Sequence, residues 1–225
     1  MQIRCTPDVG MMVQERGVAR RLEGLGIRVE GVEPGIMLRD ASPPSILELM
    51  ASAAVWTPLV IAATAFLKKI AENAADEAWT NRRQIASWLT AQAVRPFQKL
   101  CELFGEMRDA SGDNSHVCVG IPLPDQYFGA TLKLDDIGAE EMAVKLAIFI
   151  AHTEEIEVAV YSLLEGEDAP LGPVSILVAG DGTLSLAWMG GDTLVHKTRA
   201  VTEGFAEHAG AQDGESAGAP SPPVT

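Results

Sequence analysis

The stretch LMASAAVWTPLVIAATAFL, residues Leu49 to Leu67, runs for nineteen residues without a charge. It is apolar on all sides rather than along one stripe, so a helix formed here needs apolar surroundings. Those surroundings are either the protein's own core or a lipid bilayer, and nineteen residues just reach the length that crosses one. The architecture expected for the rest of the chain depends on which of the two applies.

The composition of this stretch favours a core helix. It holds six alanines, which favour insertion into lipid less than Leu, Ile, Phe or Val, and Pro58 would kink a span near its middle. The alternative is a single-pass protein of an inner membrane, with residues 49–67 as its span. The C-terminal side would then be cytoplasmic, because the positive charges that follow the stretch outnumber Arg39 before it: Lys68, Lys69, Arg82 and Arg83.

A helical segment is predicted around this stretch, over residues 45–108. Ser45 and Glu48 have the spacing of a capping box, so the apolar helix is predicted to start at Ile46 and to cover 46–78. Another helix is predicted over 79–94. An amphipathic helix is predicted after Pro96, because apolar residues recur there at helical spacing: Phe97, Leu100, Cys101, Phe104 and Met107.

A strand–helix–strand unit is predicted over residues 1–33, and a linker containing a Pro-Pro pair over 34–44. The unit has a strand at 2–5, a helix at 9–23 that ends at Gly24 and Gly26, and a second strand at 27–33. Two strands joined through one helix are normally parallel neighbours.

The second half of the chain, residues 116–202, is predicted to form an antiparallel hairpin–helix–hairpin sheet. The first hairpin has strands at 116–121 and 127–134, and a helix then runs to about Leu164 with a bend near His152. The second hairpin, at 174–179 and 183–189, has the Asp181-Gly182 turn pattern, and residues 193–201 add a last strand. Residues 203–225 are mostly Gly, Ala, Ser, Pro and acid, which predicts disorder. The fold class is therefore predicted to be α+β.

The negative charge of the chain is concentrated in its second half. Residues 1–108 carry 13 Lys and Arg against 12 Asp and Glu, whereas residues 109–225 carry 4 against 19. Because phosphate binding needs cations, this half is not expected to bind nucleic acid. A solvated acidic surface and a surface for a basic partner both remain compatible with the pattern.

The sequence shows no catalytic signature, and we expect neither a metal site nor a cofactor. Three widely spaced cysteines fit neither a disulfide framework nor a zinc site. His152 and Glu155 lie one turn apart on a predicted helix but lack the second histidine of a zinc motif. Asp135 and Asp136 are adjacent at a strand-to-helix junction, where such residues usually cap the helix.

We therefore expect a cytoplasmic, non-enzymatic protein that acts through protein contacts. We expect an accessory or regulatory role. The order of elements loosely resembles small accessory domains of bacterial conflict systems, a likeness too general to carry over any residue or activity. The predicted partner surface is an acidic band along the last long helix and beyond it, for which a basic protein would be the partner. Its residues are Glu140, Glu141, Glu154, Glu155, Glu157, Glu165, Glu167 and Asp168.

Overall fold

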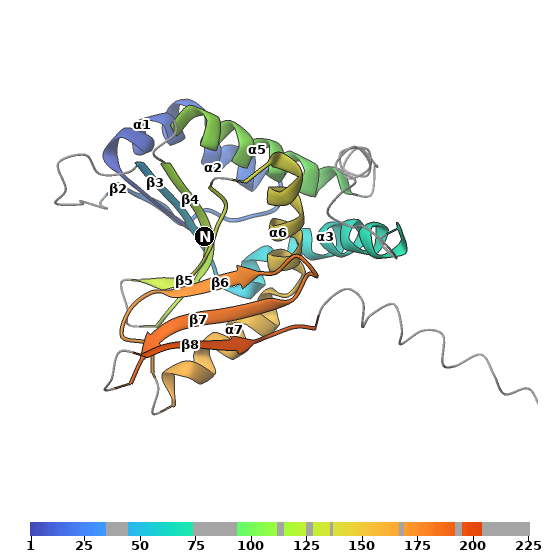
Figure 1. Ribbon diagram of the computed structural model, residues 1–225. Coiled ribbons are helices and arrows are strands. Elements are labelled where there is room, and N and C mark those ends of the chain that lie inside the picture. Colours follow the sequence, from blue (N-terminus) through green and yellow to red (C-terminus); the bar gives the residue numbers. More distant parts are fainter. Residues whose placement is uncertain are drawn as a thin grey trace, which may run out of the picture.

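A computed structural model describes residues 1–34, 45–73, 94–111, 115–124, 128–135, 137–166, 169–191 and 195–203. The predicted helix at 79–94 and the predicted disordered tail lie largely or wholly outside these ranges. Within them the chain forms helices and one eight-stranded mixed sheet, which confirms the α+β class (Figure 1).

The first three strands form the N-terminal part of the sheet. Strand β1 (Gln2–Cys5) lies between β2 (Gly31–Pro34), to which it is parallel, and β3 (Ser45–Met50), to which it is antiparallel. Helices α1 (Pro7–Glu15) and α2 (Val18–Glu23) connect β1 to β2. The parallel arrangement of the first two strands is as predicted, but β2 begins at Gly31 rather than at Ile27.

The single helix predicted over 9–23 is two helices. Gly17 separates them with a φ of +59°, a left-handed conformation that glycine adopts without steric cost. An added Cβ would meet nothing within 4 Å there, so backbone conformation rather than space is the reason for the glycine.

Residues 45–50 form strand β3, so the prediction that they begin the apolar helix is wrong. Ser45 does not cap a helix: its hydroxyl donates a hydrogen bond to the Asp8 carboxylate. The sequence from Ser45 to Glu48 also fits a strand, because Leu47 and Leu49 face the core while Glu48 lies on the opposite face. Pairing with β1 and β4 on its two sides satisfies the backbone of this strand.

The remaining strands follow in chain order. The sheet order is β2-β1-β3-β4-β5-β6-β7-β8. The added strands are β4 (Ser115–Pro122), β5 (Gly129–Lys133), β6 (Val174–Val178), β7 (Leu184–Gly190) and β8 (Val195–Ala200). Both predicted hairpins, β4–β5 and β6–β7, are antiparallel, but β5 and β6 are parallel neighbours, so the predicted antiparallel sheet is mixed. It is also continuous with the N-terminal strands.

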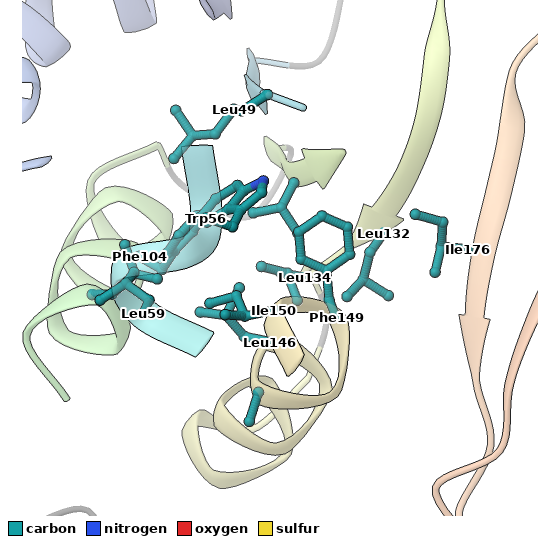
Figure 2. Close-up of a cluster of buried hydrophobic side chains, with 14 of the residues drawn as sticks. Leu49, Trp56, Leu59, Phe104, Leu132, Leu134, Leu146, Phe149, Ile150 and Ile176 are labelled. Atoms are coloured by element: carbon teal, nitrogen blue, oxygen red, sulfur yellow. The ribbon is translucent and has the colours of Figure 1, made fainter. Parts of the chain in front are cut away.

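The apolar helix is α3 (Ala53–Asn73), and one of its sides is buried among the described residues. Its buried side carries Trp56, Leu59, Ala63 and Phe66, whereas Ile61 on the opposite side is 82% exposed. The expectation of apolar surroundings on every side is therefore wrong for this helix. The indole of Trp56 contacts the ring of Phe149 edge to face, and the two ring centroids lie 5.5 Å apart (Figure 2).

Three more helices complete the core. Helix α5 (Arg95–Ser111) is the amphipathic helix that the spacing after Pro96 predicts. Helices α6 (Ala139–Ala151) and α7 (Thr153–Leu164) meet at His152, where a bend was predicted. Helices α5, α6 and α7 pack with α3 over the apolar face of the sheet. Helix α7 lies beside the last strands of the sheet (Figure 1).

Candidate protein-binding surface

Six of the eight predicted acidic residues are described, and they do not form one band. Glu140 and Glu141 lie in the first turn of α6, whereas Glu154 and Glu155 lie in the first turn of α7. The length of α6 separates the two pairs. Glu141 is also paired with Lys145 at 2.9 Å, which reduces the negative field at that end. Glu167 and Asp168 lie outside the described residues.

Glu157 has a structural role. Its Oε2 accepts a hydrogen bond from the backbone N–H of Ala53 at 3.4 Å, at the N-terminus of α3. Its Oε1 accepts a hydrogen bond from the Tyr161 hydroxyl at 3.3 Å. The first turn of a helix has unpaired N–H groups and partial positive charge, so a carboxylate there stabilises α3. Glu157 therefore takes part in the contact between α7 and α3.

The exposed side of α7 combines acidic and apolar residues. We call it the outer α7 face. Val158 is 70% exposed and Tyr161 is 36% exposed, although both side chains carry a large apolar surface. Burial and the neighbouring Glu157 carboxylate raise the pKa of the Tyr161 hydroxyl, so it stays protonated at neutral pH. The face consists of Glu154, Glu155, Val158, Tyr161, Ser162 and Glu165.

Sequence reasoning identified the acids of this face and missed its apolar centre. The signal was present in EEIEVAVYSLLE, because Ile156, Ala159, Val160 and Leu163 define a buried seam. Val158 and Tyr161 fall outside that seam by helical geometry. An exposed apolar patch bordered by charges is typical of protein-binding surfaces.

A basic strand lies next to the outer α7 face. Arg199 of β8 donates a hydrogen bond from Nη1 to the Ser162 hydroxyl at 2.8 Å. Lys197 and Arg199 together are two of the four Lys and Arg in residues 109–225. Strand β8 therefore contacts the outer α7 face through the basic side chain of Arg199.

A second group of polar residues lies on the sheet face opposite the core. The strand register places Arg4, Glu48, Cys118 and Lys133 in one row across β1, β3, β4 and β5. Beside the row, His116 Nδ1 is 2.7 Å from a carboxylate oxygen of Asp135, whose side chain is only 10% exposed. This pairing orients the imidazole.

The polar row provides no nucleophile or metal site within the described residues. Burial raises the pKa of the Cys118 thiol to about 12, so the reactive thiolate is scarce at neutral pH. No group of three His, Cys, Asp or Glu side chains in the described ranges is arranged to hold a metal ion. His152 lies 3.7 Å from Glu155, an ion-pair contact within α7 when the histidine is protonated.

The comparisons with known proteins give no relative for this chain: no protein-family model, no curated protein and no solved structure matches it. One described helical stretch, Ala53–Ala71 of α3, is long and apolar enough to cross a membrane, and 39% of it is buried inside the protein.

Proposed function

We propose that this chain is a non-enzymatic accessory or regulatory protein that binds a basic protein partner through the outer α7 face. The observation that carries the proposal is the exposure of Val158 and Tyr161 between Glu154, Glu155 and Glu165. Exposed apolar and aromatic side chains supply most of the binding energy of an interface, and bordering charges supply orientation and association rate. A cytoplasmic location fits this role.

Local stability explains only part of the acidic strip, by which we mean Glu154, Glu155 and Glu165 of the outer α7 face. Glu165 lies at the C-terminal end of α7, where a negative charge opposes the helix dipole by a few tenths of a kcal/mol, roughly. Glu154 and Glu155 are both exposed, and in the first helical turn they are favourable. Both solubility and recognition of a basic partner explain such a strip. Salt distinguishes them, because only association with a charged partner slows as the ionic strength rises.

The test compares three proteins for binding to one identified basic partner. The Glu154→Gln/Glu155→Gln protein should associate with it more slowly than wild type, and the difference should shrink at high salt. Glu157 is left intact because it contacts α3. The matched control is Ile61→Gln, which changes an 82% exposed residue on α3, outside the face. If the association rate depends neither on salt nor on the double change, the acidic strip is a solvated surface and not a binding site.

The alternative proposal is a single-pass membrane protein with a cytoplasmic sensor or scaffold domain. The length and hydropathy of α3 support it. Against it, Trp56 and Phe66 pack with Phe149 and Phe97, and Leu49 lies in a central strand of the sheet. A carbonate wash of fractionated membranes distinguishes the two: recovery of the wild-type chain only in the washed pellet would favour the membrane protein.

A further inference from the structure

The exposed side of α3 carries no charge until the helix approaches its C-terminal end. We call it the outer α3 face. Ile61 lies at its centre and is 82% exposed, more than any other large apolar side chain of the described residues. The positions of this face recur every three or four residues, so they lie along one side of the helix. Its residues are Ala54, Thr57, Pro58, Ile61, Thr64 and Lys68.

Basic side chains gather where the outer α3 face ends. The ring centroids of Phe66 and Phe97 lie 5.4 Å apart, so the first turn of α5 is beside the last turns of α3. That turn of α5 carries Arg95 and Lys99, which are exposed like Lys68. None of these three cations has an ion-pair partner among the described residues. Unpaired positive charge therefore borders an exposed, uncharged face.

Helix stability does not explain where these cations lie. Arg95 is the first residue of α5, and a positive charge there opposes the helix dipole. Lys68 precedes the last turn of α3, and the dipole acts mainly within that turn. Both cations are therefore available to an anionic surface outside the protein.

The acidic outer α7 face lies toward the opposite end of α3. Glu157 of α7 accepts a hydrogen bond from the N–H of Ala53, the first residue of α3. Lys68 is fifteen residues further along the helix, which is roughly 22 Å at about 1.5 Å per residue. Helix α7 also runs away from the C-terminal end of α3 (Figure 1). Because the Debye length is about 8 Å at physiological salt, the acids of α7 act weakly on a surface that contacts Lys68.

We propose that the outer α3 face and its neighbouring cations dock the protein reversibly on an anionic lipid surface, with α3 lying along that surface. Crossing the bilayer would take Trp56 and Phe66 out of the core, where both are fully buried. Lying on it leaves the described core unchanged. The proposal concerns a different surface from the outer α7 face, which stays exposed for a protein partner.

A lipid surface matches both parts of this region at once. Its phosphate groups attract Lys68, Arg95 and Lys99, and the layer beneath them accepts the apolar side chain of Ile61. An acidic protein would match the cations only. Binding by one exposed apolar side chain and three cations is weak, so the protein should exchange between the surface and solution.

The first test is cosedimentation with vesicles of phosphatidylcholine, alone or mixed with phosphatidylglycerol. Wild type should bind only the mixed vesicles, and less as the salt concentration rises. Lys68→Gln/Lys99→Gln should lower the partition coefficient about thirtyfold, because each basic residue near an anionic surface contributes about 1 kcal/mol. Ile61→Gln should lower it several-fold. The matched control, Glu154→Gln/Glu155→Gln, should bind no more weakly than wild type. Circular dichroism checks that each variant is folded.

The second test locates the surface that contacts lipid. The native cysteines are buried, so a polarity-sensitive dye will label a cysteine introduced at an exposed position. The emission of a dye on Ile61→Cys should shift to the blue when mixed vesicles are added, and that of a dye on Val158→Cys should not.

Three results would overturn the proposal. The first is a wild-type protein that does not bind the mixed vesicles at low salt. The second is binding that neither Ile61→Gln nor Lys68→Gln/Lys99→Gln weakens, because another surface would then contact the lipid. The third is vesicle-bound protein that resists a carbonate wash, which would mean that the chain crosses the bilayer.

Discussion

Trp56 places an indole nitrogen in the core without a hydrogen-bond partner in the described part of the chain. The side chain is fully buried. An unpaired buried donor costs about 1–3 kcal/mol, and replacing it by an apolar group removes that cost. Trp56→Phe keeps the edge-to-face contact with Phe149 and loses the donor, so we expect it to change the free energy of unfolding by only about 1 kcal/mol.

Trp56→Ala is the matched comparison. It leaves a cavity in the same place and should cost about 3–5 kcal/mol. Urea unfolding of the two variants measures both values. If Trp56→Phe were as costly as Trp56→Ala, the indole nitrogen would have to make a contact that offsets its burial.

Glu48 carries a carboxyl group whose pKa lies above its ordinary value, because burial disfavours the charged form and the nearby Arg4 only partly compensates. The folded state therefore binds a proton at Glu48 more tightly than the unfolded state does. This contribution to stability is present at low pH and is lost as the pH rises through the folded pKa.

Glu48→Gln should consequently raise the melting temperature at neutral pH relative to wild type. The gain should vanish well below pH 4.5, the ordinary pKa of the group, where wild type is also uncharged. Glu33→Gln removes an exposed carboxylate at the end of the same cross-strand row and is the control for the loss of one negative charge. A Glu48→Gln protein less stable than wild type at neutral pH would mean that the contact with Arg4 outweighs burial.

At the scale of elements, α3 offers a pair of alanines that separates a core helix from a membrane span. Ala62 is 4% exposed and lies in the core, whereas Ala54 is exposed. An arginine at Ala62 leaves a buried charge unpaired and should cost about 3–5 kcal/mol, while Ala54→Arg should leave the protein folded and soluble. Thermal unfolding compares them. Equal damage from both changes, with wild type in the membrane fraction, would favour the span.

The elements show where local pattern was sufficient for prediction. The amphipathic spacing of Phe97, Leu100 and Phe104 predicts α5, and Asp181-Gly182 predicts the β6–β7 hairpin, because the information lies within a few residues. Ser45 to Glu48 was ambiguous, since the same letters fit a helix cap and a strand. Its outcome depended on β1 and β4, which lie far away in sequence.

At the scale of the whole molecule, the sheet order could not be read from sequence. Nothing local in β5 and β6 indicates that they are parallel neighbours, or that β3 lies against β4. The candidate surface was found in part: its acids follow from charge, but Val158 becomes a candidate only once the buried side of α7 is known. The adjacency of Arg199 to Ser162 is a tertiary contact with no sequence signal.

Removal of residues 205–225 tests the prediction that the tail is disordered. These residues are poor in apolar side chains and rich in Gly, Ala, Ser and Pro, so they bury too little surface to offset the entropy of ordering. The truncated chain should melt within about 2 °C of the full chain. A larger drop would indicate that the tail packs against the folded part of the chain.

The strand order has a consequence for how the protein is made. Almost every strand lies beside the strand that comes next in the chain, the exception being the insertion of β1 between β2 and β3. A sheet of this order can be extended from one end as synthesis proceeds, because each new strand finds its neighbour already in place. Two closures are slow, β3 to β4 and β5 to β6, because long segments that contain helices separate these adjacent strands along the chain: α3 and α5 in the first case, α6 and α7 in the second. We expect nascent chains to gain protease resistance in two steps, first when β4 has emerged from the ribosome and again when β6 has paired with β5.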